Sequence, residues 1–334
     1  MKIAVIGAGA IGGLVAGYLK FKEADVSLIS RPQAKGIIKE RGLKISGARG
    51  NISVKIDVSD SLNYYPDLAI LAVKTQDIIR AVRDNSEFLK DSVILTIQNG
   101  VQAEHIVARY LPKENIISSI VMFGSTSLNP GEITHNFDGD WIVGKVFSKN
   151  DPKVFKVRQA LENIFPVQVA ENIQGMKYLK VFVNASNCLS GILGLSLQEV
   201  FRDLNISRIA IGIWKEGLNI ITKAGVKLES LPDFSLDRLT KLTSMPTDEA
   251  AKIFSGIMIN LSREPLYGSI LQSIKRGRPS EIDYINGEFV SLAKISVAPA
   301  SLNKKLVEMV HRVEKSSKFF TKAELINSTK ELFN

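Results

Sequence analysis

A glycine-rich turn at the start of the chain constrains its fold more than any other feature. Residues 2–6 (KIAVI) form a short apolar run that is typical of a buried strand. The turn that follows directly consists of Gly7, Ala8, Gly9, Ala10, Ile11 and Gly12. The spacing G-x-G-x-x-G between a strand and a helix is the signature of a dinucleotide-binding βαβ unit. Gly7 permits the tight turn, Gly9 lets the backbone approach a pyrophosphate, and Gly12 lets the helix pack on the strand. We therefore expect these six residues to bind a dinucleotide cofactor at the N-terminus of the helix.

The end of the next predicted strand indicates which dinucleotide binds. Residues 25–29 (DVSLI) read as this strand, and Ser30 and Arg31 follow it. In NAD-binding folds the strand commonly ends in an acidic residue that binds the ribose hydroxyls. An arginine cannot accept those hydrogen bonds, but it can pair with a 2′-phosphate. We predict NADP(H) as the cofactor, the alternative being that Arg31 is an ordinary surface residue of a β–α loop.

Composition and charge exclude several other classes of protein. The chain has 334 residues, which suggests two domains, and a net charge of +9, which favours anionic ligands. The lysines are spread along the chain, unlike the clustered basic patch of a nucleic-acid reader. One cysteine and three distant histidines argue against a disulfide within the chain and against a metal site. No signal peptide and no apolar run of membrane-spanning length are visible, so we expect a cytoplasmic protein.

The order of predicted elements gives the fold class. Strand-like and helix-like segments alternate through residues 1–170, which predicts an α/β fold with a Rossmann-type, doubly wound, mostly parallel sheet and helices on both faces. Two β-hairpins are expected, at 44–58 and 131–143. Residues 171–334 read almost wholly as helix, including one helix over 173–194, and form the second domain. The last 15 or so residues are polar and are expected to be mobile.

The predicted helix at 173–194 carries a narrow polar stripe on an otherwise apolar surface. Lys180, Asn184, Asn187 and Gly191 follow one another at spacings that share one helix face. Burial lowers the pKa of a lysine, which brings a proton donor closer to neutrality. The stripe is therefore a candidate catalytic surface. The alternative is a core helix whose asparagines cap neighbouring loops.

A second candidate segment spans residues 269–287. In the functional interpretation, Ser269 and Glu281 project into a cleft between the two domains. In the structural interpretation, Ser280 caps a helix and the acids after it favour the helix dipole.

Six motifs follow one another along nearly the whole chain. They are the GAGAIGG turn, Arg31, Val73-Lys74-Thr75, Gln98-Asn99-Gly100, the Lys180/Asn184 pair and residues 281–287 (EIDYING). Together they resemble the ketopantoate reductase (2-dehydropantoate 2-reductase) family. The resemblance implies a two-domain enzyme that reduces ketopantoate to pantoate with NADPH, in pantothenate and coenzyme A biosynthesis. A homodimer is a mild preference.

The resemblance also implies roles for single residues. Lys180 matches the general acid that protonates the ketone oxygen, and Asn184 matches a substrate-binding residue on the same helix. Lys177 is a competing choice for the acid, but only Lys180 lies four residues before Asn184, as in the family pattern. The remaining matches are Ser269 for the substrate carboxylate, Asn99 for cofactor and substrate together, Arg31 and Lys74 for the cofactor phosphates, and Glu281 for the cofactor ribose.

Three positions depart from the family pattern, all on the substrate side. Cys188 and Gln198 stand where the family often has a substrate-binding asparagine, and we include both among the expected substrate-binding residues. Leu266 replaces another frequent asparagine. These departures leave open a reductase of another 2-oxo acid or of an imine on the same scaffold. A non-catalytic NADP(H) sensor is a third interpretation, which the Lys180/Asn184 pair disfavours.

Overall fold

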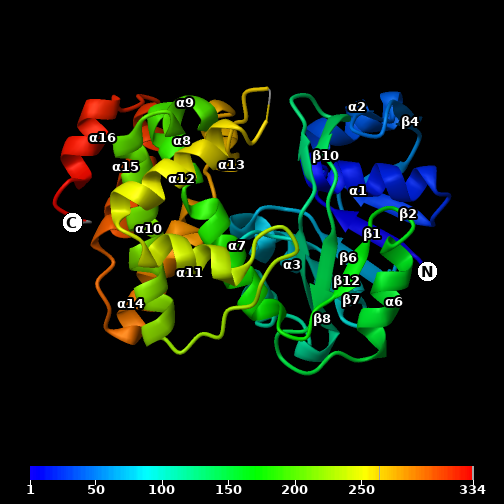
Figure 1. Ribbon diagram of the computed structural model, residues 1–334. Helices are drawn as coiled ribbons and strands as arrows, with labels where there is room; N and C mark the ends of the chain where they lie inside the picture. The colour runs from blue at the N-terminus through cyan, green and yellow to red at the C-terminus, as the bar shows by residue number, and fades with distance from the viewer. Residues whose placement is uncertain (263, 333–334) are drawn as a thin grey trace. The chain divides into compact units, whose positions relative to one another are not determined.

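Contacts divide the chain into two compact units in the computed structural model, which describes residues 1–262 and 264–332 (Figure 1). Unit 1 comprises residues 1–98 and 102–174, and unit 2 comprises residues 99–101 and 175–334. The short turn at 99–101 therefore belongs to the helical unit, although it follows directly on a strand segment of unit 1.

Unit 1 is built on an eight-stranded sheet. Its strands, in spatial order, are β12 (Val167–Val169), β11 (Trp141–Gly144), β8 (Ile116–Val121), β7 (Val93–Thr96), β6 (Leu68–Leu71), β1 (Ile3–Ile6), β2 (Val26–Ile29) and β5 (Asp57–Ser59). All neighbouring strands pair in parallel except β8 and β11, which are antiparallel. The expected Rossmann-type, mostly parallel sheet is confirmed.

Both faces of this sheet are covered. In β1, Ile3 and Val5 join a core that includes Leu14 of the following helix, while Ala4 and Ile6 point to the other face and are also buried. Burial of both faces explains why the strands read as continuous apolar runs. The helices of unit 1 are α1 (Ala10–Phe21), α2 (Pro32–Arg41), α3 (Ile78–Asp84), α4 (Ser86–Leu89), α5 (Ala103–Val107) and α6 (Pro152–Leu161), with short 3₁₀ helices η1 (Thr75–Asp77) and η2 (Lys113–Asn115).

A second, four-stranded sheet confirms part of one hairpin prediction and corrects the other. Its order is β4 (Ile52–Val54), β3 (Leu43–Gly47), β10 (Glu132–Phe137) and β9 (Gly124–Thr126). β3 and β4 do form an antiparallel hairpin, but β5 leaves it to pair with β2. The prediction of a hairpin at 131–143 is wrong, because β10 pairs in parallel with β3 and β11 joins the large sheet. Local alternation cannot reveal a partner that lies far away in the chain.

Two glycines of α1 explain how the second sheet packs there. A Cβ on Gly13 would lie 3.1 Å from Cδ1 of Ile133 in β10, and a Cβ on Gly17 would lie 2.5 Å from Cδ1 of Ile45 in β3. Side chains at these positions would push the second sheet away from α1. Figure 1 shows β10 beside α1 within unit 1.

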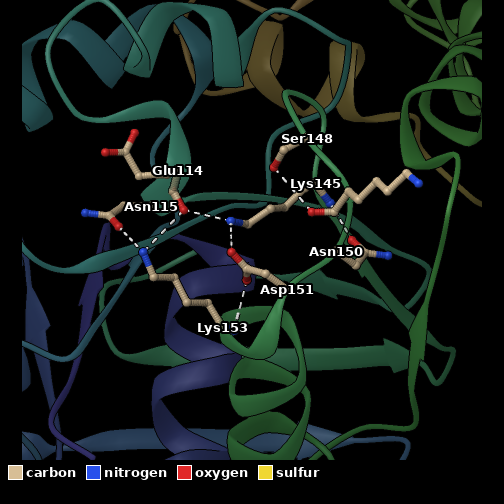
Figure 2. A network of polar contacts seen from close by, with 8 residues as sticks. Glu114, Asn115, Lys145, Ser148, Asn150, Asp151 and Lys153 are labelled. Carbon is tan, nitrogen blue, oxygen red and sulfur yellow. Dashed lines mark hydrogen bonds and ion pairs between the residues drawn. The ribbon is translucent and has the colours of Figure 1, made fainter.

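A network of polar contacts stabilises the end of the large sheet (Figure 2). The side chain of Lys145 is 2% exposed; its Nζ donates to the carbonyl oxygen of Glu114 at 2.7 Å and forms an ion pair with Asp151. Asp151 also accepts from the backbone N–H of Lys153 at 2.9 Å, which caps the N-terminus of α6. Desolvation opposes ionisation of Asp151, but the hydrogen bonds from Lys145 and Lys153 outweigh it and lower its pKa.

Replacement of Asp151 by alanine should lower the free energy of unfolding by about 2–3 kcal/mol at pH 7, because it removes a helix cap and leaves a buried ammonium group without its counter-charge. Since the folded pKa of Asp151 is lowered, this contribution is present above the unfolded pKa and disappears as the pH falls through the folded one. Urea denaturation at pH 7 measures the loss. Glu162→Gln, which breaks the exposed Arg158–Glu162 pair of the same helix, should change stability by less than about 0.5 kcal/mol.

Unit 2 is helical, as expected, apart from one isolated bridge between Leu231 and Phe234. Its elements are α7 (Ile173–Ala185), which begins at the end of unit 1, α8 (Asn187–Leu193), α9 (Leu197–Phe201), α10 (Leu204–Lys223), α11 (Leu236–Ser244), α12 (Thr247–Ile259), α13 (Ser269–Lys275), η3 (Ile282–Tyr284), α14 (Asn286–Ser296), α15 (Ser301–Ser316) and α16 (Lys322–Thr329). Along the described residues, no helix combines the length and apolar character that crossing a membrane would need.

Two helix predictions in this unit need correction. The helix expected over 173–194 is interrupted at Ser186, so α7 and α8 are separate helices. The C-terminal residues were expected to be mobile, but they include the ordered helix α16. Thr321 and Glu324 form a reciprocal capping box at the start of this helix, and Leu325 is buried. The last two residues, 333 and 334, lie outside the described part of the chain. The signature T-x-x-E was visible in the sequence and predicts this helix start.

Candidate functional site

Two glycines of the N-terminal turn are required by packing. Gly7 has φ +120°, and a Cβ there would lie 2.7 Å from the carbonyl carbon and oxygen of Ala72 after β6. A Cβ on Gly12 would lie only 1.9 Å from the carbonyl oxygen of Gly7. These contacts bring the turn, β6 and the first turn of α1 together. Any larger residue at either position would open the turn.

Gly9 differs from the other two because space around it is open. No described atom lies within 4 Å of an added Cβ, and the residue is exposed. It is the N-cap of α1, it makes no side-chain cap, and the first turn holds no acidic residue. The N–H groups of that turn can therefore receive an anion. Open space beside uncapped helix N–H groups fits the pyrophosphate of a dinucleotide.

Two cationic residues follow the strands that flank β1. Gly7 N–H donates to the carbonyl oxygen of Ile29 at 2.9 Å, which ties the glycine turn to the end of β2. Arg31 comes next, exposed at the N-cap of α2, and within the described residues it forms no ion pair. Lys74 follows β6 on the other side and is half-buried. Arg31 and Lys74 thus lie at the carboxyl ends of strands, where ligands bind in doubly wound sheets.

In unit 2, Lys180 is half-buried on α7, and its surroundings disfavour its charge. Burial lowers its pKa to about 8, and the positive charge of Lys177 contributes in the same direction, while the carboxylate of Glu281 opposes the shift. Lys177 itself is 3% exposed. The arrangement gives an ammonium group that can release its proton close to neutral pH. Glu281, expected at the cofactor ribose, is thereby placed within electrostatic reach of Lys180.

Three motifs that are far apart in the sequence meet in unit 2. Asn184 Nδ2, on α7, lies 3.5 Å from Oδ1 of Asn99, a long hydrogen bond. The next residue, Gly100, has φ +81°, and a Cβ there would lie 2.2 Å from the carbonyl oxygen of Tyr284. The QNG turn therefore contacts both the Lys180/Asn184 helix and the EIDYING segment. No single motif predicted this assembly.

The expected substrate residues on α8, α9 and α13 divide into two groups. Ser269 is exposed at the start of α13, and a Cβ on the preceding Gly268 would lie 3.0 Å from Cβ of Asn187 on α8. Ser269 is thus available to a ligand. Cys188 is fully buried, and burial raises the pKa of its thiol although Asn286 lies beside it. Substrate contact by Cys188 stays a prediction, and it would require the buried thiol to become accessible.

Substrate binding by Gln198 stays a prediction, and in this structure its side chain makes three hydrogen bonds to backbone groups. Its Nε2 donates to the carbonyl oxygens of Ser262 and Glu264 at 3.2 and 2.9 Å, and its Oε1 accepts from the N–H of Leu266 at 2.9 Å. Two of the three departures from the family pattern, Gln198 and Leu266, are therefore parts of one contact that holds a loop to α9. The sequence offered no sign of this coupling.

Within the described residues, no group of three or more His, Cys, Asp or Glu side chains is arranged to hold a metal ion. The sequence indicates Lys177 only as an alternative acid, and the structure adds that its charge lowers the pKa of Lys180. Its spacing, one helical turn before Lys180, was the available signal.

Two family models match most of the chain. The family model for ketopantoate reductase PanE/ApbA matches residues 3–147, and the model for its C-terminal part matches residues 172–314. A 2-dehydropantoate 2-reductase of Pyrococcus horikoshii is 30% identical over 306 residues, covering 91% of this chain and 94% of the relative. That of Archaeoglobus fulgidus is 22% identical and covers 94% of this chain and 98% of the relative.

Solved structures show the same fold. A PanE/ApbA family ketopantoate reductase from Ralstonia eutropha has a TM-score of 0.79 at 24% identity, covering 94% of this chain and 99% of that one. D-mandelate dehydrogenase with NADH and anilino(oxo)acetate has a TM-score of 0.81 at 24% identity, and the match covers 95% of this chain and 99% of that one.

The fold, the glycine turn and the relatives define a nicotinamide-dinucleotide-dependent oxidoreductase. More closely, the chain belongs to the ketopantoate reductase family.

Proposed function

We propose that this protein reduces 2-dehydropantoate to pantoate with NADPH, a step of pantothenate and coenzyme A biosynthesis. The observation that carries the proposal is the assembly of Lys180, Asn184 and Asn99 in unit 2 of a chain that matches the family along nearly its whole length. Residues 1–170 then form the NADP-binding domain, and residues 171–334 form the domain for the substrate and for a possible homodimer contact. A cytoplasmic location stays a prediction.

The residues of unit 1 hold the cofactor in this proposal. The glycine turn, residues 7–12, receives the pyrophosphate on the N–H groups of α1, and Gly9 provides the space for it. Arg31 pairs with the 2′-phosphate, which NADH lacks, and Lys74 contacts a cofactor phosphate. When bound, the reduced nicotinamide supplies the hydride.

The residues of unit 2 act on the substrate. Lys180 donates a hydrogen bond from Nζ to the ketone oxygen and transfers its proton as negative charge develops there. The amides of Asn184 and Asn99 orient the substrate, and the hydroxyl of Ser269 binds its carboxylate. Glu281 faces the charge of Lys180 and favours its protonated form before reaction.

The rate should fall as the pH rises through about 8. Lys180 acts as an acid, so only its protonated form is active, and its pKa is lowered to about 8. The value of kcat/KM should therefore be constant well below pH 8 and fall about tenfold per pH unit above it. A pH profile from 6 to 10 measures this. In Lys177→Ala the decline should move to higher pH, because a neighbouring positive charge is removed. A profile that is flat to pH 10 in the unaltered protein would contradict the role of Lys180.

A second candidate is the reduction of another 2-oxo acid. It is favoured by the likeness in fold to D-mandelate dehydrogenase and by the departures at Cys188, Gln198 and Leu266. The buried or occupied side chains of Cys188 and Gln198 weaken it, because changes there need not alter a substrate-facing surface.

A substrate panel distinguishes the two candidates. NADPH oxidation is followed at 340 nm with 2-dehydropantoate, pyruvate, 2-oxoisovalerate, oxaloacetate and phenylglyoxylate, the 2-oxo acid that corresponds to mandelate. Each assay is repeated with NADH. We expect the highest kcat/KM for 2-dehydropantoate with NADPH. A higher value for any other acid would replace the proposed substrate, and equal rates with NADH would remove the role of Arg31.

A further inference from the structure

A second cation lies beside Arg31 at the end of β2. Lys35 is on α2, and its N–H donates to the carbonyl oxygen of Arg31 at 3.0 Å. Residues four apart on a helix are neighbours on its surface. The side chain of Lys35 is 35% exposed. Lys35 therefore lies one helical turn after Arg31, at the start of α2.

Asp60 holds Lys35 at this position. β5 pairs in parallel with β2, with Ile29 opposite Ser59, and Ser30 N–H donates to the carbonyl oxygen of Ser59 at 2.9 Å. The two strands thus end level with each other, about 5 Å apart, which places Asp60 beside the start of α2. Oδ2 of Asp60 lies 2.8 Å from Nζ of Lys35, and this hydrogen bond lowers the pKa of Asp60.

We propose that Lys35 is a second determinant of the preference for NADPH. When NADPH binds, the ammonium group of Lys35 leaves Asp60 and pairs with the 2′-phosphate. Asp60 competes with the phosphate for Lys35 and thereby limits the affinity for NADPH. The inference rests on the proposed function, because it assumes that Arg31 receives this phosphate. The side chains of Lys35 and Asp60 are 35% and 48% exposed, so breaking their ion pair costs little free energy. A phosphate carries more charge and more acceptor oxygens than a carboxylate and is the stronger partner.

The two members of the pair should have opposite effects on binding. Kd values for NADPH and NADH are measured by fluorescence titration at low salt. Lys35→Ala should raise the Kd for NADPH about threefold, and Asp60→Asn should lower it about threefold, with the Kd for NADH unchanged in both. Lys39→Ala and Glu40→Gln remove the same charges at exposed positions of α2 and serve as matched controls.

A merely structural ion pair would behave differently. If both variants weakened NADPH binding, or if NADH were affected as strongly as NADPH, the inference would be wrong. Arg31→Ala separates this failure from failure of the proposed function. Loss of NADPH preference in Arg31→Ala together with no effect of Lys35→Ala would overturn only the role of Lys35. No effect of Arg31→Ala would overturn the proposed phosphate site itself.

Discussion

Replacement of Lys180 by alanine should lower kcat for 2-dehydropantoate by about 10²–10⁴-fold, which is the usual contribution of a positioned general acid. The Kd for NADPH should change by less than about twofold, because the glycine turn, Arg31 and Lys74 all belong to the other unit. Steady-state kinetics and a fluorescence titration measure the two quantities on the same preparation.

Lys177→Ala is the matched control for this variant. It removes the same side chain one turn earlier on α7, from a position that is 3% exposed. We expect it to retain most of its activity below pH 8. If Lys177→Ala lost activity and Lys180→Ala kept it, the acid would be Lys177. If both variants remained active, neither lysine would be the acid.

Two alanine variants of the glycine turn should fail in different ways. Gly9 has φ −82° and open space around it, so Gly9→Ala should fold normally. Its methyl group should then occupy space that the pyrophosphate needs, and the Kd for NADPH should rise at least about tenfold. Titration with NADPH measures this effect.

Gly12→Ala should instead damage the fold. Its Cβ would lie 1.9 Å from the carbonyl oxygen of Gly7, and backbone atoms must move to relieve the contact. We expect a loss of about 3 kcal/mol or more and a fall in Tm of about 6–12 °C. Thermal unfolding without cofactor measures it. Unchanged NADPH binding in Gly9→Ala, together with a normal Tm, would show that the turn does not receive the pyrophosphate.

Much of unit 1 was predictable because its signals are local. Each parallel strand reads as an apolar run, and the glycine turn marks the first β–α junction. The second sheet was not predictable, since β3 and β10 pair across a long stretch of sequence. Gly13 and Gly17 offered a hint, because two extra glycines on α1 leave room for a packed neighbour.

The candidate site was predictable in its residues and not in its geometry. Periodicity placed Lys180 and Asn184 on one helix face, and the structure keeps both on α7. The contact between Asn99 and Asn184 depends on how a turn after β7 folds against a distant helix. The use of Gln198 to hold the 262–266 loop was equally hidden, because side-chain to backbone contacts of this kind leave no periodic pattern in a sequence.

The most direct test of the account is to identify the product. The protein is incubated with limiting NADPH and an excess of 2-dehydropantoate, and pantoate is quantified by mass spectrometry alongside the NADPH consumed. We predict one pantoate formed for each NADPH oxidised. Tight NADPH binding without any pantoate would contradict the account and would mean that this member of the family acts on a different substrate.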